Sequence, residues 1–381
     1  CNFVFPEGEM KRPLPNNATE IDELDNINEN KMDAYVPKEG SIEEHEKVEK
    51  MQDLPYIERI QQAIEYLEIN KETLFTASGL ENYSPKFSKV LEKLLDSDLL
   101  GKHLIYSQFR TMEGIGILKL VLEANGFAEF KIKNISKRWS IDVNEEDVGK
   151  PMFALYTGTE SQEEKEIIRN IYNGTWDYVP ASIVSQLQTI SNHENNMYGN
   201  VIKTLMISAS GAEGISLKNV RYVHIIEPYW HPVRTQQVIG RARRICSHQE
   251  LPMEHRTVDV FMYLMTFTQE QIESDGAIEL RLQDTGKTTS RPLTSDEALY
   301  EISNIKEKIN FDILNAVKTA SIDCSIHNKD GNLECFTFGE SSPEKYISYP
   351  SIENEELDDT AKVNKREVEF TAREIKFKGD K

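Results

Sequence analysis

Cysteine is scarce in this chain, and the few cysteines are far apart. The 381 residues contain four of them, and no two form a C-x-x-C pair. This spacing excludes a disulfide-rich scaffold and a standard zinc motif. Cys324 and Cys335 flank His327, but these residues do not complete a metal-ligand set, so we predict buried thiols and no metal site. The cysteine usage favours a reducing, intracellular compartment.

Long apolar runs are also missing. No segment approaches the roughly 20 apolar residues that cross a bilayer, and Cys1 to Glu7 lack the basic and apolar regions of a signal peptide. We therefore expect no membrane partner. The first residue is cysteine and not methionine, and we expect the chain to be a piece of a longer protein.

A complete phosphate-binding loop is absent from the sequence. Gly286-Lys287-Thr288 resembles the end of a P-loop, but Arg281 stands where the first glycine of G-x-x-x-x-G-K-[ST] belongs. Asp296-Glu297-Ala298-Leu299 resembles an acidic metal-binding motif, but Arg291 to Ser295 precede it where an apolar strand would be expected. We therefore predict that it starts a helix capped by Ser295. A lysine and Mg²⁺ ligands for nucleotide phosphates would have to come from elsewhere.

Basic residues are in the minority, and they are unevenly placed. The formal net charge is −20, which argues against a surface that is basic throughout. Residues 11–60 hold 13 acids and 7 bases, and residues 351–360 hold five acids and no base. Residues 201–250 instead hold 7 bases and 3 acids. Any contact with a polyanion is therefore expected in residues 201–250.

Short apolar runs alternate with helical patterns through the middle of the chain. Amphipathic helices are predicted within residues 57–74 and 87–95, a helix at 114–124 that ends at Gly126, and a helix start at Ser161. Strands are predicted at residues 103–107, 153–158, 204–208, 220–226 and 257–265. This alternation predicts an α/β fold in which helices cover both faces of a parallel sheet.

Changes in composition divide the chain into four predicted segments. These are an acidic linker with a short helix (1–80), the α/β lobe (81–270), a helical extension (271–340) and an acidic, charged tail (341–381). Residues 129–150 and 177–200 interrupt the βα rhythm and are predicted to be insertions. Apolar residues from Leu299 to Leu314 recur at near-helical spacing, which predicts that the extension packs against the lobe.

The strongest chemical signal is the run Gln237-Val238-Ile239-Gly240-Arg241-Ala242-Arg243-Arg244. Two arginines three residues apart would share one side of a helix, and Gly240 permits close backbone approach. Guanidinium groups stay charged and match phosphate oxygens, although a solvated basic helix face has the same pattern.

Two segments upstream strengthen the phosphate interpretation. In Ile207 to Ser216 an apolar run ends in small residues that leave backbone amides free for an anion, unless they only form a tight turn. In Val223 to Pro232 an apolar run ends in polar and aromatic groups. Ligands of open α/β sheets bind at the carboxyl ends of the strands.

These three segments, in this order, resemble motifs V, Va and VI of superfamily 2 helicases and of the related chromatin-remodelling ATPases. Leu104 to Phe109 resembles motif IV, and Tyr156-Thr157-Gly158 resembles the motif that follows it. The resemblance spans residues 100–266 and implies a RecA-like second motor lobe of an ATP-dependent helicase or translocase. ATP and Mg²⁺ would be the cofactors. A missing N-terminal RecA-like lobe would hold them, so this chain alone would be inactive.

The resemblance also implies roles for individual residues. Arg241 and Arg244 would be catalytic and would reach the γ-phosphate of ATP. ATP binding would also involve Gln237, Gly240, Glu213, Gly214 and Ser216, and the nucleic-acid backbone would contact Ser107, Gln108, Thr157, Gly158, Ser208, Ser210 and Gly211. Ser216 departs from the family, because many members place an acidic residue there to hold the ribose.

The two ends resemble a narrower group. Cys1 to Pro6 and Ser321 to Cys324 resemble segments that bracket this lobe in helicase-like NTPases of large cytoplasmic DNA viruses, including poxvirus transcription-associated ATPases. This resemblance implies DNA or RNA as ligand, RNA polymerase or other transcription machinery as partner, and a place in infected-cell cytoplasm or virions. One alternative is a non-enzymatic binding module on a degenerate helicase fold, because arginines alone do not establish turnover. Another is a structural platform whose acidic ends recruit a basic partner.

Overall fold

The computed structural model describes two compact parts of the chain. The described residues are 2–6, 10, 12–13, 56–110, 112–135, 138–157, 160–191, 193–209, 214–274, 292–321, 324 and 335. One unit extends to Ser303, and the second begins at Asn304. The P-loop-like run 286–288 and the acidic run 351–360 lie outside the described residues.

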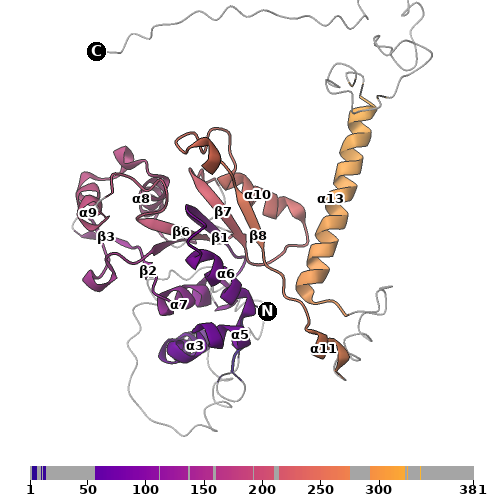
Figure 1. Cartoon of the computed structure of the whole chain (residues 1–381), viewed down its shortest axis with the longest axis horizontal. Coiled ribbons are helices and arrows are strands. Elements are labelled where there is room, and N and C mark those ends of the chain that lie inside the picture. Colours follow the sequence, from indigo (N-terminus) through magenta and orange to yellow (C-terminus); the bar gives the residue numbers. More distant parts are fainter. Residues whose placement is uncertain are drawn as a thin grey trace, which may run out of the picture. The chain divides into compact units, whose positions relative to one another are not determined.

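A six-stranded parallel sheet forms the centre of the first unit (Figure 1). Its spatial order is β2 (Ala128–Glu129), β5 (Met152–Tyr156), β6 (Ile202–Ile207), β1 (Lys102–Tyr106), β7 (Val220–Ile225) and β8 (Asp259–Met262). Tyr106 pairs with Ile207 and Ile225, and Tyr156 also pairs with Ile207. The strands therefore end in register, and the segments that follow them leave the sheet at one edge.

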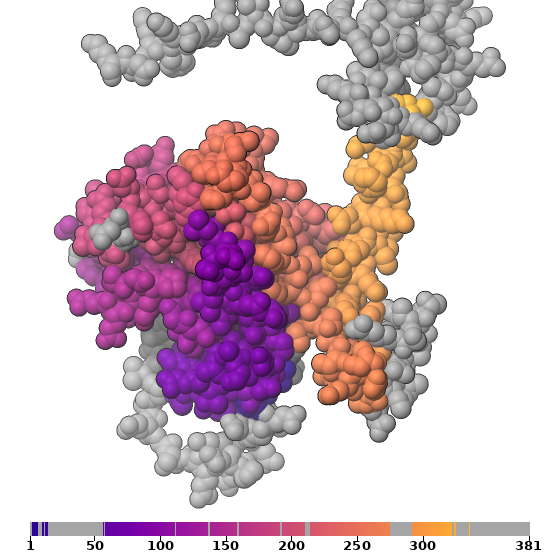
Figure 2. Space-filling view, in the orientation of Figure 1, coloured from indigo at the N-terminus to yellow at the C-terminus, as the bar shows by residue number. Residues whose placement is uncertain are grey.

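Helices cover both faces of this sheet (Figure 1). On one face lie α3 (Tyr56–Ile69), α4 (Lys71–Leu74), α5 (Ala77–Tyr83), α6 (Pro85–Leu95), the π-helical turn η3 (Met112–Gly116) and α7 (Ile117–Ala124). On the other lie α8 (Gln162–Asn173), α9 (Ala181–Ser191) and α10 (Pro232–Ala242). In the space-filling view of Figure 2 the violet surface of α6 lies between the magenta and orange parts of the lobe.

Alternation along the strands explains how one sheet serves two cores. Leu104 and Tyr106 of β1 enter the core under α8 to α10, while Ile105 enters the core under α3 to α7. Phe153 and Ala154 of β5 divide in the same way. Successive side chains of a strand point to opposite faces, so continuous apolar strands require cover on both sides. The predicted α/β fold with a parallel sheet is confirmed.

Local sequence signals define several helix ends. Ser84 caps α6 by accepting from the Phe87 N–H at 3.2 Å, and Pro85 occupies the first helical position, where its missing N–H costs no hydrogen bond. Ser161 caps α8 as predicted, because its hydroxyl accepts from the Glu164 N–H at 3.2 Å. Gly174 ends α8 at φ +81°, a left-handed conformation that favours glycine.

The first predicted insertion, 129–150, contributes to the main sheet. Edge strand β2 overlaps its beginning, and β3 (Ile132–Ile135) and β4 (Arg138–Ile141) form an antiparallel hairpin before the short helix η4 (Glu145–Asp147). Phe130 and Ile132 are buried in the core under α8 to α10. Only part of this segment is therefore peripheral to the lobe.

The second predicted insertion, 177–200, is integrated into the core. After the turn η5 (Trp176–Tyr178), helix α9 buries Ile183 and Leu187. Asn196 is fully buried, and its Nδ2 donates to the carbonyls of Tyr172 and Ile202 at 3.0 Å. The polar composition of residues 177–200 suggested an insertion. Sequence alone does not show that backbone carbonyls would accept from the Asn196 amide and allow it to be buried.

The predicted helical extension contains α13 (Ser295–Thr319), after α11 (Gln269–Glu273). Its cap is Thr294 and not the predicted Ser295. The Thr294 hydroxyl accepts from the Glu297 N–H at 3.2 Å, and the Glu297 carboxylate accepts from the Thr294 N–H at 2.9 Å. This reciprocal pair is a capping box, which satisfies two backbone donors. Asp296 faces the buried side, where it pairs with Lys86.

The second unit holds the remainder of α13 and a disulfide. In this part of α13 the side chains of Ile305, Ile309 and Leu314 are exposed. Cys324 and Cys335 are joined, which corrects the prediction of two separate thiols. Their sequence separation is 11, and spacing alone does not show which cysteines pair. No described helix is long and apolar enough to cross a bilayer.

Candidate functional site

Helix α10 carries the predicted phosphate-binding run. Its N-terminus is capped by His231, whose Nδ1 accepts from the Val233 N–H at 3.2 Å. Thr235, Val238 and Ala242 are buried, which leaves Gln237 on the exposed face. The apolar stripe therefore directs the polar part of the run outward.

The two arginines do not share one helix side, which corrects that prediction. Arg241 lies in the last turn of α10, but the helix ends at Ala242, and Arg243 is the C-cap residue. The Ser247 hydroxyl contacts the carbonyls of Ala242 and Arg244 at 3.0 and 2.9 Å. These contacts satisfy carbonyls that a longer helix would have paired, so Arg244 lies just beyond the helix.

The guanidinium groups of Arg241 and Arg244 are still available to a ligand. Arg244 is exposed, and its Nη1 donates to the Ser216 hydroxyl at 2.6 Å. The Nε of Arg241 is buried and has no hydrogen-bond partner among the described residues. Beyond the backbone of its own helix, a Cβ at Gly240 would meet no atom within 4 Å, so the surface of α10 is open at this position. Buried donors without partners are uncommon, and this one suits an acceptor supplied by a ligand.

The loop before β7 is bound to the end of α10. The Leu217 N–H donates to the Arg241 carbonyl at 3.3 Å. Asn173, buried at the end of α8, donates to the Ser216 carbonyl at 3.0 Å and accepts from the Lys218 N–H at 2.9 Å. Asn173 thus holds the loop that presents Ser216. Sequence reasoning missed Asn173, because an asparagine at a helix end usually caps the chain locally.

The structure places Gly214 in this loop at φ +71°, where a Cβ would meet no atom within 4 Å. Gly214, Ser216, Gly240, Arg241 and Arg244 therefore belong to one connected region. Gln237 lies on the same helix, one turn before Arg241. Four further predicted residues lie outside the described residues: Gly158, Ser210, Gly211 and Glu213.

The remaining predicted residues lie at the carboxyl edge of the sheet. Ser107 follows β1, Thr157 follows β5 and Ser208 follows β6, and all three are buried. The Ser208 hydroxyl donates to the Thr157 carbonyl at 2.8 Å, and the Thr157 hydroxyl contacts Glu160 at 3.2 Å. These hydroxyls connect neighbouring strands. The predicted site residues thus form two groups, because α10 runs back from the carboxyl edge toward the start of β7.

Glu227 organises the carboxyl edge, and sequence reasoning did not single it out. Its Oε1 accepts from the Ser107 hydroxyl at 2.8 Å, and its Oε2 accepts from the Gln108 N–H at 2.9 Å. Burial raises the pKa of Glu227, while hydrogen bonds from Gln108, Ser107 and Asn2 oppose that rise. Two exposed aromatic residues follow these contacts in the sequence: Phe109 comes directly after Gln108, and Trp230 comes shortly after Glu227.

The side chains that could ligate a metal are dispersed in the described part of the chain. Among them, no group of three or more His, Cys, Asp or Glu side chains is placed to hold a metal ion. The half-buried Arg241 and the exposed Arg244 instead suit an anion such as a nucleotide phosphate.

This geometry coincides with a known domain. Residues 181–246 match the family model of the helicase conserved C-terminal domain. The chain carries a helicase C-terminal domain. The match begins at α9 and ends just after α10, so it contains the Ser216 loop and both arginines.

Viral proteins are similar to a larger part of the chain. The helicase-family protein R350 of Acanthamoeba polyphaga mimivirus is 32% identical over 263 residues, which is 68% of this chain and 26% of that protein. The termination factor NPH-I homolog of African swine fever virus (isolate Tick/Malawi/Lil 20-1/1983) is 30% identical over 261 residues, 67% of this chain and 35% of that protein. The chain thus spans only about a quarter to a third of the length of these viral relatives. The similarity itself confirms the predicted resemblance to helicase-like proteins of large DNA viruses.

The comparison with solved structures gives a weaker similarity. The C-terminal part of the Fun30 ATPase domain is 15% identical, with a TM-score of 0.31, over 78% of this chain and 86% of that chain.

Proposed function

We propose that this chain is the second motor lobe of an ATP-dependent nucleic-acid helicase or translocase. Arg241 and Arg244 contact the phosphates of an ATP molecule that a first RecA-like lobe holds. The supporting observation is that the guanidinium of Arg244 is exposed and donates to neutral partners, the Ser216 hydroxyl at 2.6 Å and the Gly240 carbonyl at 3.4 Å. A hydroxyl binds a guanidinium more weakly than a phosphate does, so Arg244 can exchange Ser216 for a nucleotide oxygen.

The binding energy of the arginines would then serve catalysis. An arginine aimed at a transferring γ-phosphoryl group stabilises its charge and raises the rate by about 10³ to 10⁵. Gln237, Gly240 and Gly214 shape the approach to the nucleotide, together with Glu213. Mg²⁺ and the phosphate-cradling lysine come from the first lobe. The loop 208–219 joins the carboxyl edge to the arginines, and we propose that it couples the ATP state to the bound nucleic acid.

The carboxyl edge is the proposed nucleic-acid interface. The ends of β1, β5 and β6 meet there, and they carry Ser107, Gln108, Thr157 and Ser208. In this proposal their segments contact the phosphate backbone together with Gly158, Ser210 and Gly211. Backbone contacts carry no sequence information and weaken as salt concentration rises.

The biological setting follows from the viral relatives. One of them is named a termination factor homolog, and we extend that role to this chain as a proposal. The ligand would be DNA or RNA during viral transcription, in infected-cell cytoplasm or virions, with RNA polymerase or its accessory proteins as partners.

The test is ATP hydrolysis by the full-length protein with and without nucleic acid. Arg241→Ala and Arg244→Ala should each lower the stimulated rate by about 10³-fold or more. Arg243→Ala is the matched control, because Arg243 is also exposed and lies between the two. The present chain by itself should be inactive.

Two results would contradict the proposal. Equal losses in all three arginine variants would show a general charge effect. A full-length protein that binds nucleic acid but never hydrolyses ATP would instead be a non-enzymatic binding module.

A further inference from the structure

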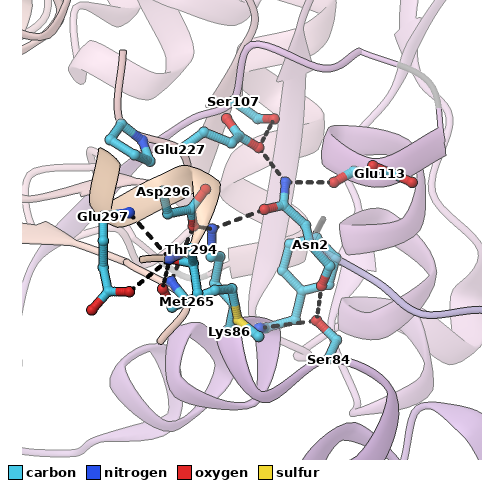
Figure 3. A network of polar contacts seen from close by, with 12 residues as sticks. Asn2, Ser84, Lys86, Ser107, Glu113, Glu227, Met265, Thr294, Asp296 and Glu297 are labelled. Atoms are coloured by element: carbon cyan, nitrogen blue, oxygen red, sulfur yellow. Dashed lines mark hydrogen bonds and ion pairs between the residues drawn. The ribbon is translucent and has the colours of Figure 1, made fainter. Parts of the chain in front are cut away.

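A buried chain of polar contacts lies below the carboxyl edge of the sheet and does not involve the proposed ATP-binding arginines (Figure 3). It joins segments that are far apart in the sequence. One end is Ser107, after β1, and the other is Asp296, at the start of α13. Asn2 lies between them. All of these side chains belong to the first compact unit.

Asn2 connects an acid to a base. Its Nδ2 donates to the Glu227 carboxylate and to the Glu113 carbonyl, the latter at 2.7 Å. Its Oδ1 accepts from Lys86 Nζ at 2.9 Å. Asn2 is 3% exposed, so water does not replace these partners. A side-chain amide is neutral and offers both a donor and an acceptor, and this position uses both.

The acid, Glu227, holds the segment that follows β1. It accepts from the Ser107 hydroxyl and from the Gln108 N–H. The Gln108 side chain donates in turn to the Pro228 carbonyl at 3.2 Å. Both the backbone and the side chain of Gln108 are thus placed by Glu227 and its neighbour. In the proposed function Gln108 contacts nucleic acid.

The base, Lys86, continues the chain toward α13. Its Nζ donates to Asp296 Oδ2 at 2.6 Å, and the same oxygen accepts from the Met265 N–H at 3.0 Å. Met265 follows β8, and Glu227 follows β7 and binds the segment after β1. The Asn2 amide therefore links side chains that contact the ends of these three strands. The Asn2 amide thus bridges Glu227 and Lys86 without adding a charge, while Lys86 forms its ion pair with Asp296.

Contacts other than the Asn2 side chain hold residues 2–6 in place. The Val4 N–H donates to the Tyr83 carbonyl at 2.8 Å, and the Ser84 hydroxyl donates to the Asn2 carbonyl at 2.5 Å. Phe3 is fully buried in the core under α3 to α7. A change confined to the Asn2 amide should therefore leave the segment docked.

We infer that Asn2 and Glu227 are positioning residues that set the geometry of residues 107–109 for nucleic acid and make it depend on the docked segment 2–6. This role rests on the proposed function. When segment 2–6 is displaced, Glu227 loses a donor, and the buried carboxylate draws more strongly on Ser107 and Gln108. The affinity for nucleic acid thereby responds to a segment that lies outside the interface.

The test exchanges the two groups. Asn2→Asp places a second carboxylate against Glu227, and Glu227→Gln places a second amide against Asn2. The double variant restores an amide opposite a carboxylate with the same net charge. In that variant the carboxylate at position 2 faces Lys86, and the amide oxygen at position 227 can still accept from the Gln108 N–H. Val4→Ala is the control, because Val4 is 53% exposed in the same segment.

The readout is ATP hydrolysis by the full-length protein, titrated with duplex DNA and with homopolymeric RNA. Each single variant should raise the half-saturating nucleic-acid concentration about tenfold, the factor expected for one lost charged hydrogen bond, with a smaller change in maximal rate. The double variant should recover part of this loss and not all of it, because the Glu113 carbonyl still faces a carboxylate oxygen at position 2. The Val4→Ala control should match wild type.

The outcomes separate the two ideas. Wild type that shows no nucleic-acid-stimulated hydrolysis overturns the proposed function and this role with it. If nucleic acid stimulates wild type but the single variants have its half-saturating concentration, only the positioning role is overturned. The same holds if the double variant shows no recovery. If the single variants have a lower maximal rate and a lower melting temperature but an unchanged half-saturating concentration, the network is purely structural.

Discussion

A buried histidine pair predicts a steep loss of stability in mild acid. His103 and His224 lie on neighbouring strands β1 and β7, and neither is exposed. The Nδ1 of His103 lies 2.9 Å from the Nε2 of His224, whose Nδ1 lies 2.8 Å from the Tyr263 hydroxyl. The stacked rings of Tyr222 and Phe261 close the row on either side. Water is excluded, so a charge on either imidazole is poorly solvated.

The sign of the effect follows from the lowered pKa values. Burial, with a smaller contribution from the charge of Lys93, lowers the pKa of His224 to about 3. Burial and then the neighbouring His224 and Lys203 hold the pKa of His103 well below its usual value. The unfolded state binds the proton more readily, with a pKa of about 6.5. The stability from the neutral pair is therefore complete above about pH 6.5 and is lost as the pH falls toward 3.

The size of the effect can be worked out for one histidine. Between pH 7.5 and pH 5, a group that titrates at about 6.5 when unfolded and about 3 when folded costs about 2 kcal/mol of unfolding free energy. His103 adds a loss in the same direction. Urea unfolding of wild type at the two pH values should show a drop at least this large, on top of the contributions of other groups.

The variant His224→Gln isolates the histidine contribution. It should be less stable at pH 7.5, because it disturbs contacts with His103 and Tyr263, but its loss between pH 7.5 and pH 5 should be smaller by about 2 kcal/mol. An identical pH dependence in wild type and His224→Gln would refute the argument.

Two further substitutions test the packing around the interface. Lys86→Met removes the cation that pairs with the buried Asp296 carboxylate, and it should lower the free energy of unfolding by about 3 to 5 kcal/mol in chemical denaturation. Lys89→Met removes an exposed pair and should have no measurable effect. Equal effects of the two variants would rule out a stabilising buried pair. Gly114→Ala places a Cβ against the Phe109 carbonyl and the Ser107 hydroxyl. It should weaken nucleic-acid binding and lower the melting temperature. Gly126→Ser is the control: its φ of +83° strains a serine although a Cβ there meets open space, so it should lower the melting temperature without changing binding. Normal binding by Gly114→Ala would show that residues 107–109 tolerate displacement.

Some features of this lobe could be read directly from the chain. Apolar runs such as 103–107 and 204–208 predicted strands because a strand buried on both faces has no polar alternation to interrupt it. Ser161 predicted a helix start because a hydroxyl at that position satisfies free backbone N–H groups within the next turn. The run from Gln237 to Arg244 also gave the candidate region for binding a phosphate, because guanidinium groups match phosphate oxygens.

Other features depended on contacts between distant residues. Ser295 was predicted as the cap of α13, but Thr294 has the better geometry with Glu297. Residues 177–200 looked peripheral because their many polar groups gave no sign that Asn196 would be satisfied inside the core. In both cases local composition was ambiguous, and neighbouring backbone groups decided the outcome.

By itself the sequence determined the alternating strands and helices, the cap at Ser161 and the residue types that suit a phosphate, because each depends on interactions within a few neighbouring residues. Only the tertiary structure decided that α10 stops before Arg244, that Ser216 meets that arginine and that Asn2 joins Glu227 to Lys86. Asn2 and Glu227 are 225 residues apart. Hydrogen bonds act over about 3 Å of space whatever the distance along the chain, so only folding can select these partners.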